Sequence, residues 1–425
     1  MGRANVSLVN LGCRVNRAEL DAIGRELSRE GIRIVCRDEA EAIVVNTCAV
    51  TSEAQAKTRR ALRRAAEEPD VRAIVATGCA ASLFSAELEA LDSRIVVEPE
   101  RERVAQRVAY LLGLGHGGGG AEADQAFCVG AVTPTGRMRP GLKVQDGCDR
   151  RCSYCIVWKA RGPARSMPPE RVVACVGELV SDGAREVVLT GIDLGRYESG
   201  GVELSGLLAR ILEQTGVGRV RLSSVEPAGV TEELLDLIAS SGGRVAPFLH
   251  VPLQSGCDAT LARMARPYTS EAYARMAERA KAMVPGIALS TDVIVGFPGE
   301  TDAEFQESLA LCASLGFSRL HVFRYSRRPG TAAAAMKSQV EPAVSLERSR
   351  RMRALSDACA SEFSTALVGT PQLVLCERGC MGTTGGGARV RTDAGLAGSL
   401  AWLAPHSSDA AGVLDARGCR IIRQE

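Results

Sequence analysis

Residues 147–155 read Gly147-Cys148-Asp149-Arg150-Arg151-Cys152-Ser153-Tyr154-Cys155 and place three cysteines at Cys-x3-Cys-x2-Cys spacing. An iron–sulfur cluster normally takes four thiolates, so three thiolates on one short loop can hold three corners of a cubane and leave one iron open to a small molecule. A zinc site or a chance group of buried thiols is the alternative. Zinc prefers two separated Cys-x2-Cys pairs or a Cys/His mixture, and no histidine lies near this loop. The spacing therefore favours a cluster with one open iron.

The chain after this loop alternates apolar runs with amphipathic helical patterns, which is typical of a barrel built from β/α units. Strands are expected over residues 142–145, 186–190, 219–223, 248–251, 288–295 and 319–323, and helices over residues 169–180, 204–214, 231–239, 270–283 and 302–314. Six units within a domain of residues 137–364 favour an open partial barrel over a closed eightfold one. Such barrels carry their chemistry at the carboxyl ends of the strands, and the three-cysteine loop follows the first strand.

Four later strand ends lead into loops rich in glycine and polar residues. These loops contain Gly191, Glu226, Gln254 and Gly296 in turn. Any one of them is an ordinary turn, but four loops on one face can supply hydrogen bonds and close backbone approach to a nucleoside-bearing cofactor.

Residues 1–112 show another strand–helix alternation, which predicts a doubly wound parallel sheet and therefore an α/β protein. Strands are expected over residues 6–11, 32–35, 42–46, 73–77 and 94–97, and helices over residues 19–29, 52–66 and 101–112.

Three cysteines of this first domain come just after strands. Cys13, Cys48 and Cys79 each follow the carboxyl end of an expected strand. In an open α/β sheet these ends share one edge, where ligands bind, so the three thiols are expected to converge on a second site. Three unrelated buried thiols are the alternative, because cysteine is among the most buried residue types. Cys36 lacks a comparable turn and is interpreted as structural.

Two further segments differ in composition from the α/β parts. Residues 113–136 contain the run Gly117-Gly118-Gly119-Gly120 and are interpreted as a flexible linker. Residues 365–425 show short strand patterns between glycine-rich turns, which predicts a small all-β barrel. Its strands are expected over residues 372–375, 388–391, 396–403, 412–414 and 420–422, and its cysteines Cys376, Cys380 and Cys419 are interpreted as structural thiols.

Composition limits the classes of function without choosing one. The 425 residues allow two or three domains, and a net charge of +2 does not indicate a nucleic-acid partner by itself. Lys57-Thr58-Arg59-Arg60 and Arg63-Arg64 form a basic stretch on an expected helix, which is either a solvated face or a nucleic-acid contact. Fifteen cysteines, no visible signal peptide and no apolar run of about 20 residues predict a cytoplasmic protein with metal-binding thiols rather than disulfides, and no membrane association.

Taken together, these motifs resemble those of the radical S-adenosylmethionine (SAM) methylthiotransferases across essentially the whole chain. The Cys148/Cys152/Cys155 loop with Tyr154 is similar to the radical SAM signature, and Arg161-Gly162 followed by Arg165-Ser166 is similar to its flank in methylthiotransferases. Further matches are Leu253-Gln254-Ser255-Gly256, Met264-Ala265-Arg266-Pro267-Tyr268-Thr269, Gly296-Phe297-Pro298-Gly299-Glu300 and Tyr325-Ser326-Arg327-Arg328-Pro329-Gly330-Thr331. The C-terminal barrel is similar to the TRAM domain, an RNA-binding module.

The resemblance implies two 4Fe–4S clusters and SAM as cofactors. Cys148, Cys152 and Cys155 would hold the cluster whose open iron binds SAM and gives a 5′-deoxyadenosyl radical. Cys13, Cys48 and Cys79 would hold an auxiliary cluster whose open iron carries the sulfur. The residues expected at the SAM site are Tyr154, Gly191, Glu226, Gln254 and Gly296, and no catalytic residue is assigned beyond the cluster ligands.

The substrate follows from fewer residues. Leu11-Gly12-Cys13-Arg14-Val15-Asn16 and Asn46-Thr47-Cys48-Ala49-Val50-Thr51 resemble most the branch that modifies N6-threonylcarbamoyladenosine, at carbon 2, next to the tRNA anticodon. The expected partners are the tRNA anticodon stem-loop and a low-potential electron donor, with the protein acting as a monomer. Isopentenyladenosine tRNA and a ribosomal protein are alternative substrates, and a non-catalytic, zinc-stabilised RNA-binding protein is a third reading. Trp158-Lys159 departs from the Pro-Tyr that the family usually has there.

Overall fold

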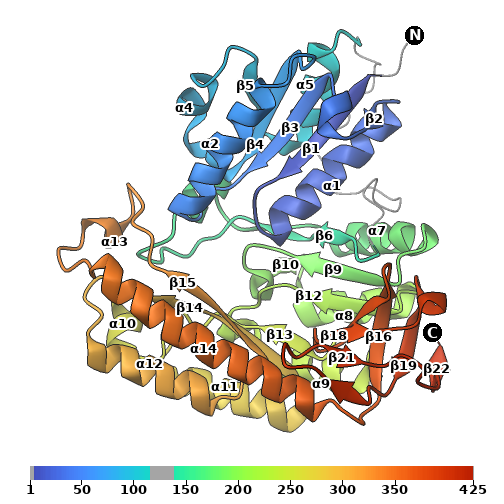
Figure 1. Ribbon diagram of the computed structural model, residues 1–425, viewed down its shortest axis with the longest axis vertical. Coiled ribbons are helices and arrows are strands. Elements are labelled where there is room, and N and C mark those ends of the chain that lie inside the picture. The colour runs from blue at the N-terminus through green and yellow to red at the C-terminus, as the bar shows by residue number, and fades with distance from the viewer. Residues whose placement is uncertain (1–3, 115–137, 425) are drawn as a thin grey trace. The chain divides into compact units, whose positions relative to one another are not determined.

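The structure is a computed structural model that describes residues 4–114 and 138–424 (Figure 1). Almost all of the predicted linker, residues 113–136, therefore lies outside the described residues. The chain divides into two compact units. The first contains residues up to Arg151 together with residues 155–184 and 190–192, and the second contains residues 152–154, 185–189 and 193–425. The four-part division expected from the sequence stays a prediction.

The first unit contains the parallel sheet expected at the N-terminus. Its strands are β1 (Asn5–Asn10), β2 (Arg33–Ile34), β3 (Ala42–Thr47), β4 (Ala73–Gly78) and β5 (Ile95–Val97). They lie in the order β2-β1-β3-β4-β5, and every neighbouring pair is parallel. The strands β3 and β4 are buried along their whole length, which explains their unbroken apolar runs.

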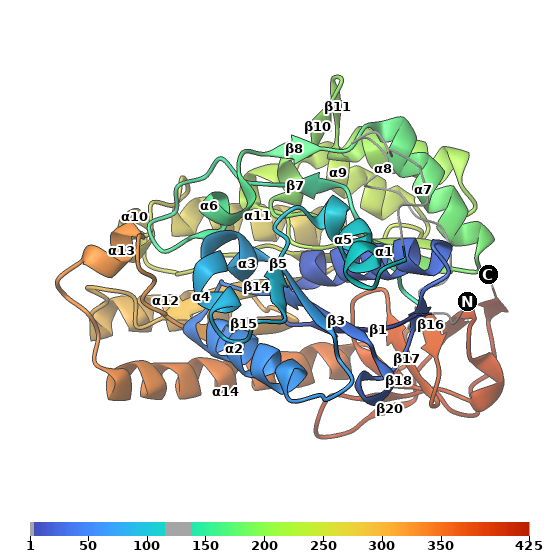
Figure 2. The ribbon, with the colours of Figure 1, turned by 90° about the horizontal axis from the view of Figure 1, so that it is seen from above.

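Helices cover both faces of this sheet, so the prediction of a doubly wound arrangement is confirmed (Figure 2). On one face α1 and α5 bury Leu20, Ile23 and Val108 against the strands. On the other face α2, α3 and α4 contribute Leu62 and Ala80 to a second core. The helix bounds are α1 (Arg14–Arg29), α2 (Ser52–Ala66), α3 (Cys79–Leu83), α4 (Ser85–Glu89) and α5 (Val104–Leu111).

The first unit also contains the segment around the three-cysteine loop. Its elements are β6 (Gly141–Lys143), β7 (Gln145–Asp146), α6 (Val157–Arg161), β8 (Arg165–Ser166) and α7 (Pro169–Ser181). The short strands β7 and β8 pair antiparallel on either side of the loop. Helix α6 packs against α3, and β6 packs against α1, so this segment shares a core with the N-terminal sheet.

The second unit is built on parallel strands with helices between them. The strands β9 and β12 pair with each other, and β13, β14 and β15 form a second parallel group. Bridges from Val220 to Val245 and from Ser224 to His250 join the two groups. The strand bounds are β9 (Glu186–Thr190), β12 (Arg219–Leu222), β13 (Phe248–His250), β14 (Ala288–Val295) and β15 (Arg319–Arg324), with a small hairpin of β10 (Glu198–Ser199) and β11 (Val202–Glu203).

The helices of the second unit are mostly those expected. They are α8 (Leu204–Gln214), α9 (Glu232–Ser240), α10 (Asp258–Arg263), α11 (Ser270–Met283), α12 (Asp302–Ser314), α13 (Ala332–Ala335) and α14 (Pro342–Ala366). Helices α10, α13 and α14 were not expected, and α14 runs along β15 (Figure 1). Ser356 Oγ accepts from Leu320 N at 3.1 Å and donates to Leu320 O at 2.9 Å, so α14 satisfies backbone groups of this strand.

The C-terminal residues form a mainly antiparallel sheet in the order β20-β21-β18-β17-β16-β19-β22. Its strands are β16 (Gln372–Glu377), β17 (Met381–Thr384), β18 (Arg389–Arg391), β19 (Leu400–Leu403), β20 (Ser407–Ser408), β21 (Leu414–Asp415) and β22 (Arg423–Gln424). Strands β17 and β20 were missed, and the strand expected over residues 420–422 begins at Arg423 instead. Arg219 and Arg221 are buried, pair with Glu186 and donate to backbone oxygens of residues 373–385, which fastens this sheet to β12.

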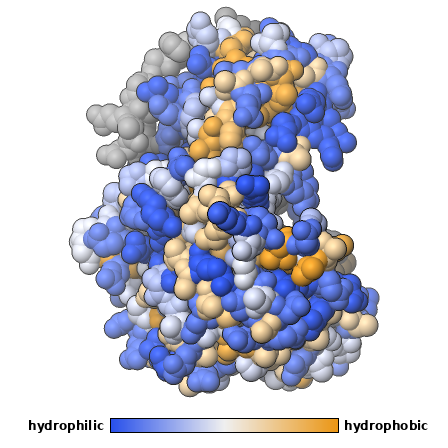
Figure 3. Space-filling view, turned by 90° about the vertical axis from the view of Figure 1, so that its left-hand side faces the viewer, coloured by the Kyte–Doolittle hydropathy of each residue, from blue (hydrophilic) through white to orange (hydrophobic). Residues whose placement is uncertain are grey.

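The surface carries both hydrophilic and hydrophobic residues. On the face shown in Figure 3, hydrophilic residues cover most of the area and hydrophobic residues form smaller groups among them. Among residues 4–114 and 138–424, no helix is both long enough and apolar enough to cross a membrane.

Candidate functional site

Cys13, Cys48 and Cys79 lie at the carboxyl edge of the N-terminal sheet, as the sequence predicts. Cys13 is the N-cap of α1, Cys48 follows β3 directly, and Cys79 is the first residue of α3. The sheet order changes direction between β1 and β3, and ligands bind at this kind of switch point. The thiols are close enough that charges on Cys13 and Cys79 each raise the pKa of Cys48. The structure therefore brings the three residues together.

Backbone geometry explains the glycine before Cys79. Gly78 has φ of +92°, and a Cβ atom there would lie 2.3 Å from Asn46 Oδ1 and 2.5 Å from the Thr47 carbonyl oxygen. Only glycine avoids both the left-handed strain and the clash. The chain can thus turn from β4 into α3 while Cys79 stays beside the end of β3.

Two asparagines fix the turn that carries Cys13. Asn16 Nδ2 donates to Asn46 Oδ1 and to Thr47 O, both at 2.9 Å, and Asn46 Nδ2 donates to Asn16 O at 2.7 Å. The Cys13 thiol donates to Asn16 Oδ1 at 3.2 Å. Since both asparagines are buried, these bonds connect the first turn of α1 to the end of β3.

The surroundings of Cys13 and Cys48 favour the protonated thiol over the thiolate. Burial raises the pKa of Cys48 to about 11. Cys13 is an exposed residue, but protein atoms surround its thiol, and this local burial raises the pKa of the thiol. The charge of Arg161 acts in the opposite direction and lowers that pKa. Thiols in such surroundings ionise when a metal or another positive charge compensates the thiolate.

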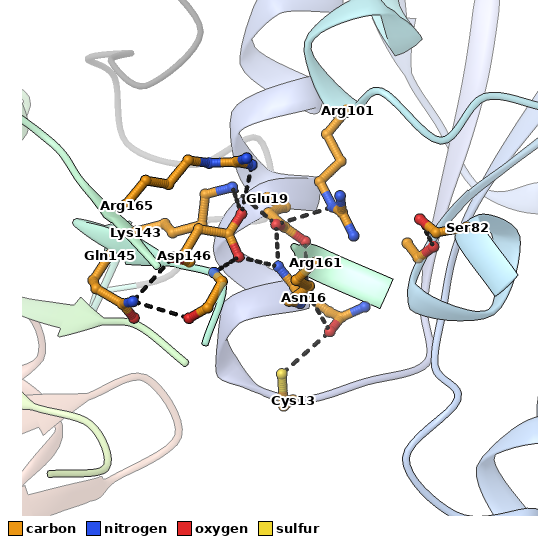
Figure 4. A network of polar contacts seen from close by, with 12 residues as sticks. Cys13, Asn16, Glu19, Ser82, Arg101, Lys143, Gln145, Asp146, Arg161 and Arg165 are labelled. Carbon is orange, nitrogen blue, oxygen red and sulfur yellow. Dashed lines mark hydrogen bonds and ion pairs between the residues drawn. The ribbon is translucent and has the colours of Figure 1, made fainter. Parts of the chain in front are cut away.

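A buried network of charged side chains surrounds Glu19 of α1, near Cys13 (Figure 4). Arg161 donates to Glu19 Oε1 at 2.8 Å and to Asp146 Oδ1 at 2.9 Å, and Lys143 Nζ donates to the same carboxylates at 2.9 and 3.0 Å. The side chains of Arg161 and Asp146 are 0% exposed and that of Glu19 is 2% exposed. Burial alone would raise the pKa of Glu19, but Lys143, Arg161 and Arg101 lower it to about 2.

The three-cysteine loop contributes to both units. Cys148 and Cys155 belong to the first, whereas Cys152 and Tyr154 belong to the second. In the first unit, Cys148 N donates to Gly162 O at 3.1 Å, and Gly147 has φ of +71° with the Pro163 carbonyl oxygen 1.8 Å from where a Cβ would lie.

Trp158, which departs from the family pattern, lies just after this loop. The guanidinium carbon of Arg151 is 4.1 Å from the centre of the Trp158 ring, and Lys159 Nζ is 5.2 Å from it. Cations at these distances over an indole ring are attracted to it. The tryptophan therefore ties α6 to the loop residue Arg151.

In the second unit, Cys152 is held by Arg266. Arg266 Nη1 donates to Cys152 Sγ at 3.2 Å, Nε donates to Tyr268 Oη at 2.9 Å, and Nη2 pairs with Glu226. Burial disfavours the charge of Arg266, but Tyr154, Glu226 and the neighbouring groups raise its pKa above the usual range. The guanidinium thus stays charged and connects Cys152, an expected cluster ligand, to the expected SAM residue Glu226.

Tyr154 packs against other aromatic side chains of the second unit. Its ring meets Phe297 edge to face with centroids 6.3 Å apart, and Phe297 meets Tyr325 at 5.3 Å. Ser153, its neighbour, donates from N to Met264 O at 3.0 Å. The tip of the loop is therefore anchored in an apolar cluster of the second unit.

The other expected SAM residues occupy strand ends. Gln254 follows β13 with φ of +68°, a left-handed conformation that is uncommon outside glycine and that often marks a functional site. Gly296 follows β14, and a Cβ there would lie 2.6 Å from Ser345 Oγ. In the first unit, a Cβ on Gly191 would lie 2.8 Å from Gln145 Oε1.

Ser223 Oγ, after β12, is buried without a hydrogen-bond partner, so it is available to a ligand.

The donor set fits iron–sulfur clusters. None of the six expected ligands, Cys13, Cys48, Cys79, Cys148, Cys152 and Cys155, forms a disulfide in the structure. Across the described residues, no three His, Cys, Asp or Glu side chains surround a single metal position. A cubane does not require that arrangement, because each thiolate binds a different iron.

Sequence reasoning missed the residues that support the cysteines. Asn16, Glu19, Arg161 and Arg266 were not singled out as site residues. Arg161 and Arg266 lie inside motifs that carried the family resemblance, and this was the available signal. Glu19 had none, because its partners are more than 100 residues away along the chain.

Two family descriptions match this chain. The Radical SAM superfamily matches residues 142–312, and Uncharacterized protein family UPF0004 matches residues 5–97. The chain is 37% identical to Threonylcarbamoyladenosine tRNA methylthiotransferase MtaB of Bacillus subtilis (strain 168) over 374 residues, which cover 85% of this chain and 82% of that protein.

Two other relatives are similar at somewhat lower identity. Ribosomal protein uS12 methylthiotransferase RimO of Desulforudis audaxviator (strain MP104C) is 33% identical, over 88% of this chain and 85% of that protein. The tRNA-2-methylthio-N(6)-dimethylallyladenosine synthase of Zymomonas mobilis subsp. mobilis is also 33% identical, over 87% and 85%.

A solved structure agrees with the fold. The radical S-adenosylmethionine methyltransferase TsrM from Kitasatospora setae superposes with a TM-score of 0.56 at 16% identity, covering 78% of this chain and 77% of that one. At that identity the likeness concerns the fold alone. The long relatives and both family matches lead to one conclusion: the chain belongs to the radical SAM methylthiotransferase family and is an enzyme of that type.

Proposed function

We propose that this enzyme transfers a methylthio group to carbon 2 of N6-threonylcarbamoyladenosine next to the anticodon of tRNA. The observation that carries the proposal is the pair of cysteine triads without disulfides, Cys13/Cys48/Cys79 and Cys148/Cys152/Cys155, which follow the carboxyl ends of parallel strands or lie in one loop. Membership of the radical SAM superfamily already implies SAM and one 4Fe–4S cluster. The second triad supports a second cluster in the same chain.

The six cysteines would divide between the two clusters. Cys148, Cys152 and Cys155 would hold the one that binds SAM, and Cys13, Cys48 and Cys79 would hold the auxiliary one. When loaded, these groups supply reductive cleavage of SAM, with one electron from a low-potential donor, and delivery of the methylthio sulfur.

The protein residues keep these thiolates in place and protect the site. Arg266 donates to Cys152 Sγ and binds Glu226, so a shift of the loop would break a hydrogen bond from a guanidinium that Glu226 holds in place. The aromatic rings of Tyr154, Phe297 and Tyr325 pack against one another and shield the loop tip from water. Glu226, Gln254, Gly296 and the unpaired Ser223 hydroxyl would contact SAM in the second unit, and Gly191 would do so in the first.

The choice of substrate rests on the relatives and on two short motifs. One relative named for threonylcarbamoyladenosine is 37% identical, and three more with that name are 32–33% identical. The relatives named for uS12 and for the dimethylallyl nucleoside are 33% identical. Residues 11–16 and 46–51 surround Cys13 and Cys48 and support the same choice. The C-terminal sheet, with a strand pattern similar to a TRAM domain, is proposed as an RNA contact.

The proposal is tested by anaerobic reconstitution followed by competition among substrates. The reconstituted protein is incubated with SAM, dithionite and equal amounts of threonylcarbamoyladenosine tRNA, isopentenyladenosine tRNA and ribosomal protein uS12. Mass spectrometry should detect 2-methylthio addition on the threonylcarbamoyladenosine tRNA well above the other two. Preferential modification of either competitor would overturn the proposed substrate.

A further inference from the structure

The buried network around Arg161 carries more positive than negative charge. Its two carboxylates, Glu19 and Asp146, face three largely buried basic side chains, Arg161, Lys143 and Arg101, and Arg101 Nε lies 3.0 Å from Glu19 Oε1. The half-exposed Arg165 also bonds to Asp146, with its Nη2 3.3 Å from Oδ2. The side chains of Arg101 and Lys143 are only 11% and 10% exposed. Excess charge away from water is costly unless an opposite charge lies near it.

Arg161 links this network to the cysteine edge. Arg161 Nη2 donates to Asn16 Oδ1 at 3.3 Å, and the Cys13 thiol donates to the same oxygen at 3.2 Å. One buried amide oxygen thus separates the guanidinium from the thiol.

The same guanidinium also connects the two cysteine segments. Glu19 lies on α1, one turn beyond Asn16 and on the face that begins at Cys13. Asp146 immediately precedes Gly147-Cys148, and its Oδ1 accepts from Gly147 N at 2.8 Å as well as from Arg161. Arg161 therefore bonds to the helix that starts at Cys13 and to the turn that leads into Cys148.

We propose that Arg161 is a positioning residue that sets the electrostatic environment of the Cys13/Cys48/Cys79 cluster and raises its reduction potential. The inference rests on the proposed ligand set. Reduction of a cluster adds one negative charge, and a fixed positive charge in a medium of low dielectric constant stabilises that charge. The carboxylates Glu19 and Asp146 are negatively charged and partly offset the effect of Arg161. The reduction potential therefore depends on the balance of charges in the network.

A purely structural role for the network predicts a different response. If Arg161 only holds α1 to the turn, removing Arg161 or Glu19 should loosen the fold in a similar way, with loss of cluster in both cases. If the charge acts on the cluster, the two substitutions should shift its potential in opposite directions. The sign of the shift therefore separates the two roles.

The test uses full-length protein with Cys148, Cys152 and Cys155 changed to Ala, so that a single cluster contributes to the spectrum. Four versions are compared after anaerobic reconstitution: this background, Arg161→Met, Arg161→Lys and Glu19→Gln. Arg165→Gln is the matched control, because its side chain is 53% exposed and bonds to the same Asp146. Each midpoint potential is measured by a redox titration followed by electron paramagnetic resonance, with iron content determined in parallel.

We expect Arg161→Met to make the one-electron reduction about tenfold less favourable, which is about 59 mV. Glu19→Gln should shift the potential the other way. Arg161→Lys keeps the charge and should stay near the background value, as should Arg165→Gln, whose charge is screened by water. Equal potentials in all versions, or shifts of one sign for Arg161→Met and Glu19→Gln, would overturn the inference while leaving the proposed ligands intact. Absence of any cluster from the background protein would instead overturn the ligand set and the inference with it.

Discussion

At the scale of single residues, the positions of the cysteines followed from the sequence and their supports did not. Cys13, Cys48 and Cys79 could be placed on one edge because each follows an apolar strand, and parallel strands end on the same side. Arg161 and Glu19 are 142 positions apart, and no local pattern indicates that a guanidinium and a carboxylate will share a core. Long-range polar contacts of this kind depend on the finished packing.

Gly78 provides a test of how the cysteine edge is built. Gly78→Ala should destabilise the protein by about 3 kcal/mol or more, because left-handed strain adds to a clash with Asn46 and Thr47. Gly31→Ala is the matched control, since Gly31 also has positive φ, at +78°, but has no atom within 4 Å of the added Cβ. We expect about 1 kcal/mol for the control in urea unfolding. Equal losses in the two variants would contradict the clash.

Glu26, on α1, should make stability depend on pH. Burial, together with nearby Glu30, raises the pKa of Glu26 to about 7. Its ionisation therefore opposes folding progressively as the pH rises from about 4.5 to 7, and the full loss of stability is present above that range. Glu26→Gln should raise the melting temperature of the cluster-free protein at pH 8 and leave it nearly unchanged at pH 4.5.

The control for this measurement is Glu39→Gln, which changes an exposed carboxylate in the same domain. It should have little effect at either pH. A gain for Glu26→Gln that is the same at pH 4.5 and pH 8 would show that ionisation of Glu26 does not oppose folding.

At the scale of elements, most of the longer strands and amphipathic helices were predicted. The start of α1, the short helices α3, α4, α6, α10 and α13, and the long helix α14 were not. Helix α1 was expected to begin at Glu19 but begins at Arg14, because its first turn is stabilised by Asn16 bonding to Asn46 rather than by local sequence. Helix α14 was missed because most of its buried positions are polar, so apolar periodicity does not reveal it. These positions are Ser345, Arg348, Ser349, Met352, Ser356, Cys359 and Ser364.

Helix α2 is the element whose charge suits an RNA backbone. It carries five basic residues and one acidic residue, whereas the whole chain has a net charge of +2, so the rest of the chain is slightly negative. Lys57 pairs with Glu53 at 2.7 Å, and Arg60, Arg63 and Arg64 are exposed. The basic stretch of the sequence thus forms an exposed cationic face on a helix that begins four residues after Cys48.

If this face contacts tRNA phosphates, Arg60→Gln with Arg64→Gln should weaken tRNA binding severalfold. The slope of log K against log salt concentration should fall by about 2, because two phosphate contacts are lost. Arg29→Gln with Arg33→Gln removes the same charge from exposed sites in the same domain and should change the slope little. Equal changes for the two double variants would show that only total charge matters.

At the scale of the whole molecule, each compact unit combines segments that are far apart along the chain. Most of the segment around the three-cysteine loop lies in one unit with the N-terminal sheet, and the C-terminal sheet lies in the other unit with the strands β12 to β15. In each unit the link is a buried ion-pair network, around Arg161 in the first and around Glu186 in the second. Composition and linker patterns indicate where the chain is connected, but they do not show which segments will pack together.

The central claim, a two-cluster enzyme that acts on threonylcarbamoyladenosine tRNA, is tested most directly by mass spectrometry of tRNA nucleosides and ribosomal proteins from a deletion strain. The strain is complemented with the wild-type gene, with the Cys148/Cys152/Cys155→Ala variant or with the Cys13/Cys48/Cys79→Ala variant. The account predicts that the deletion loses 2-methylthio-threonylcarbamoyladenosine, that wild type restores it, and that neither triple variant does. Persistence of the nucleoside in the deletion strain, or its full restoration by either triple variant, would contradict the account.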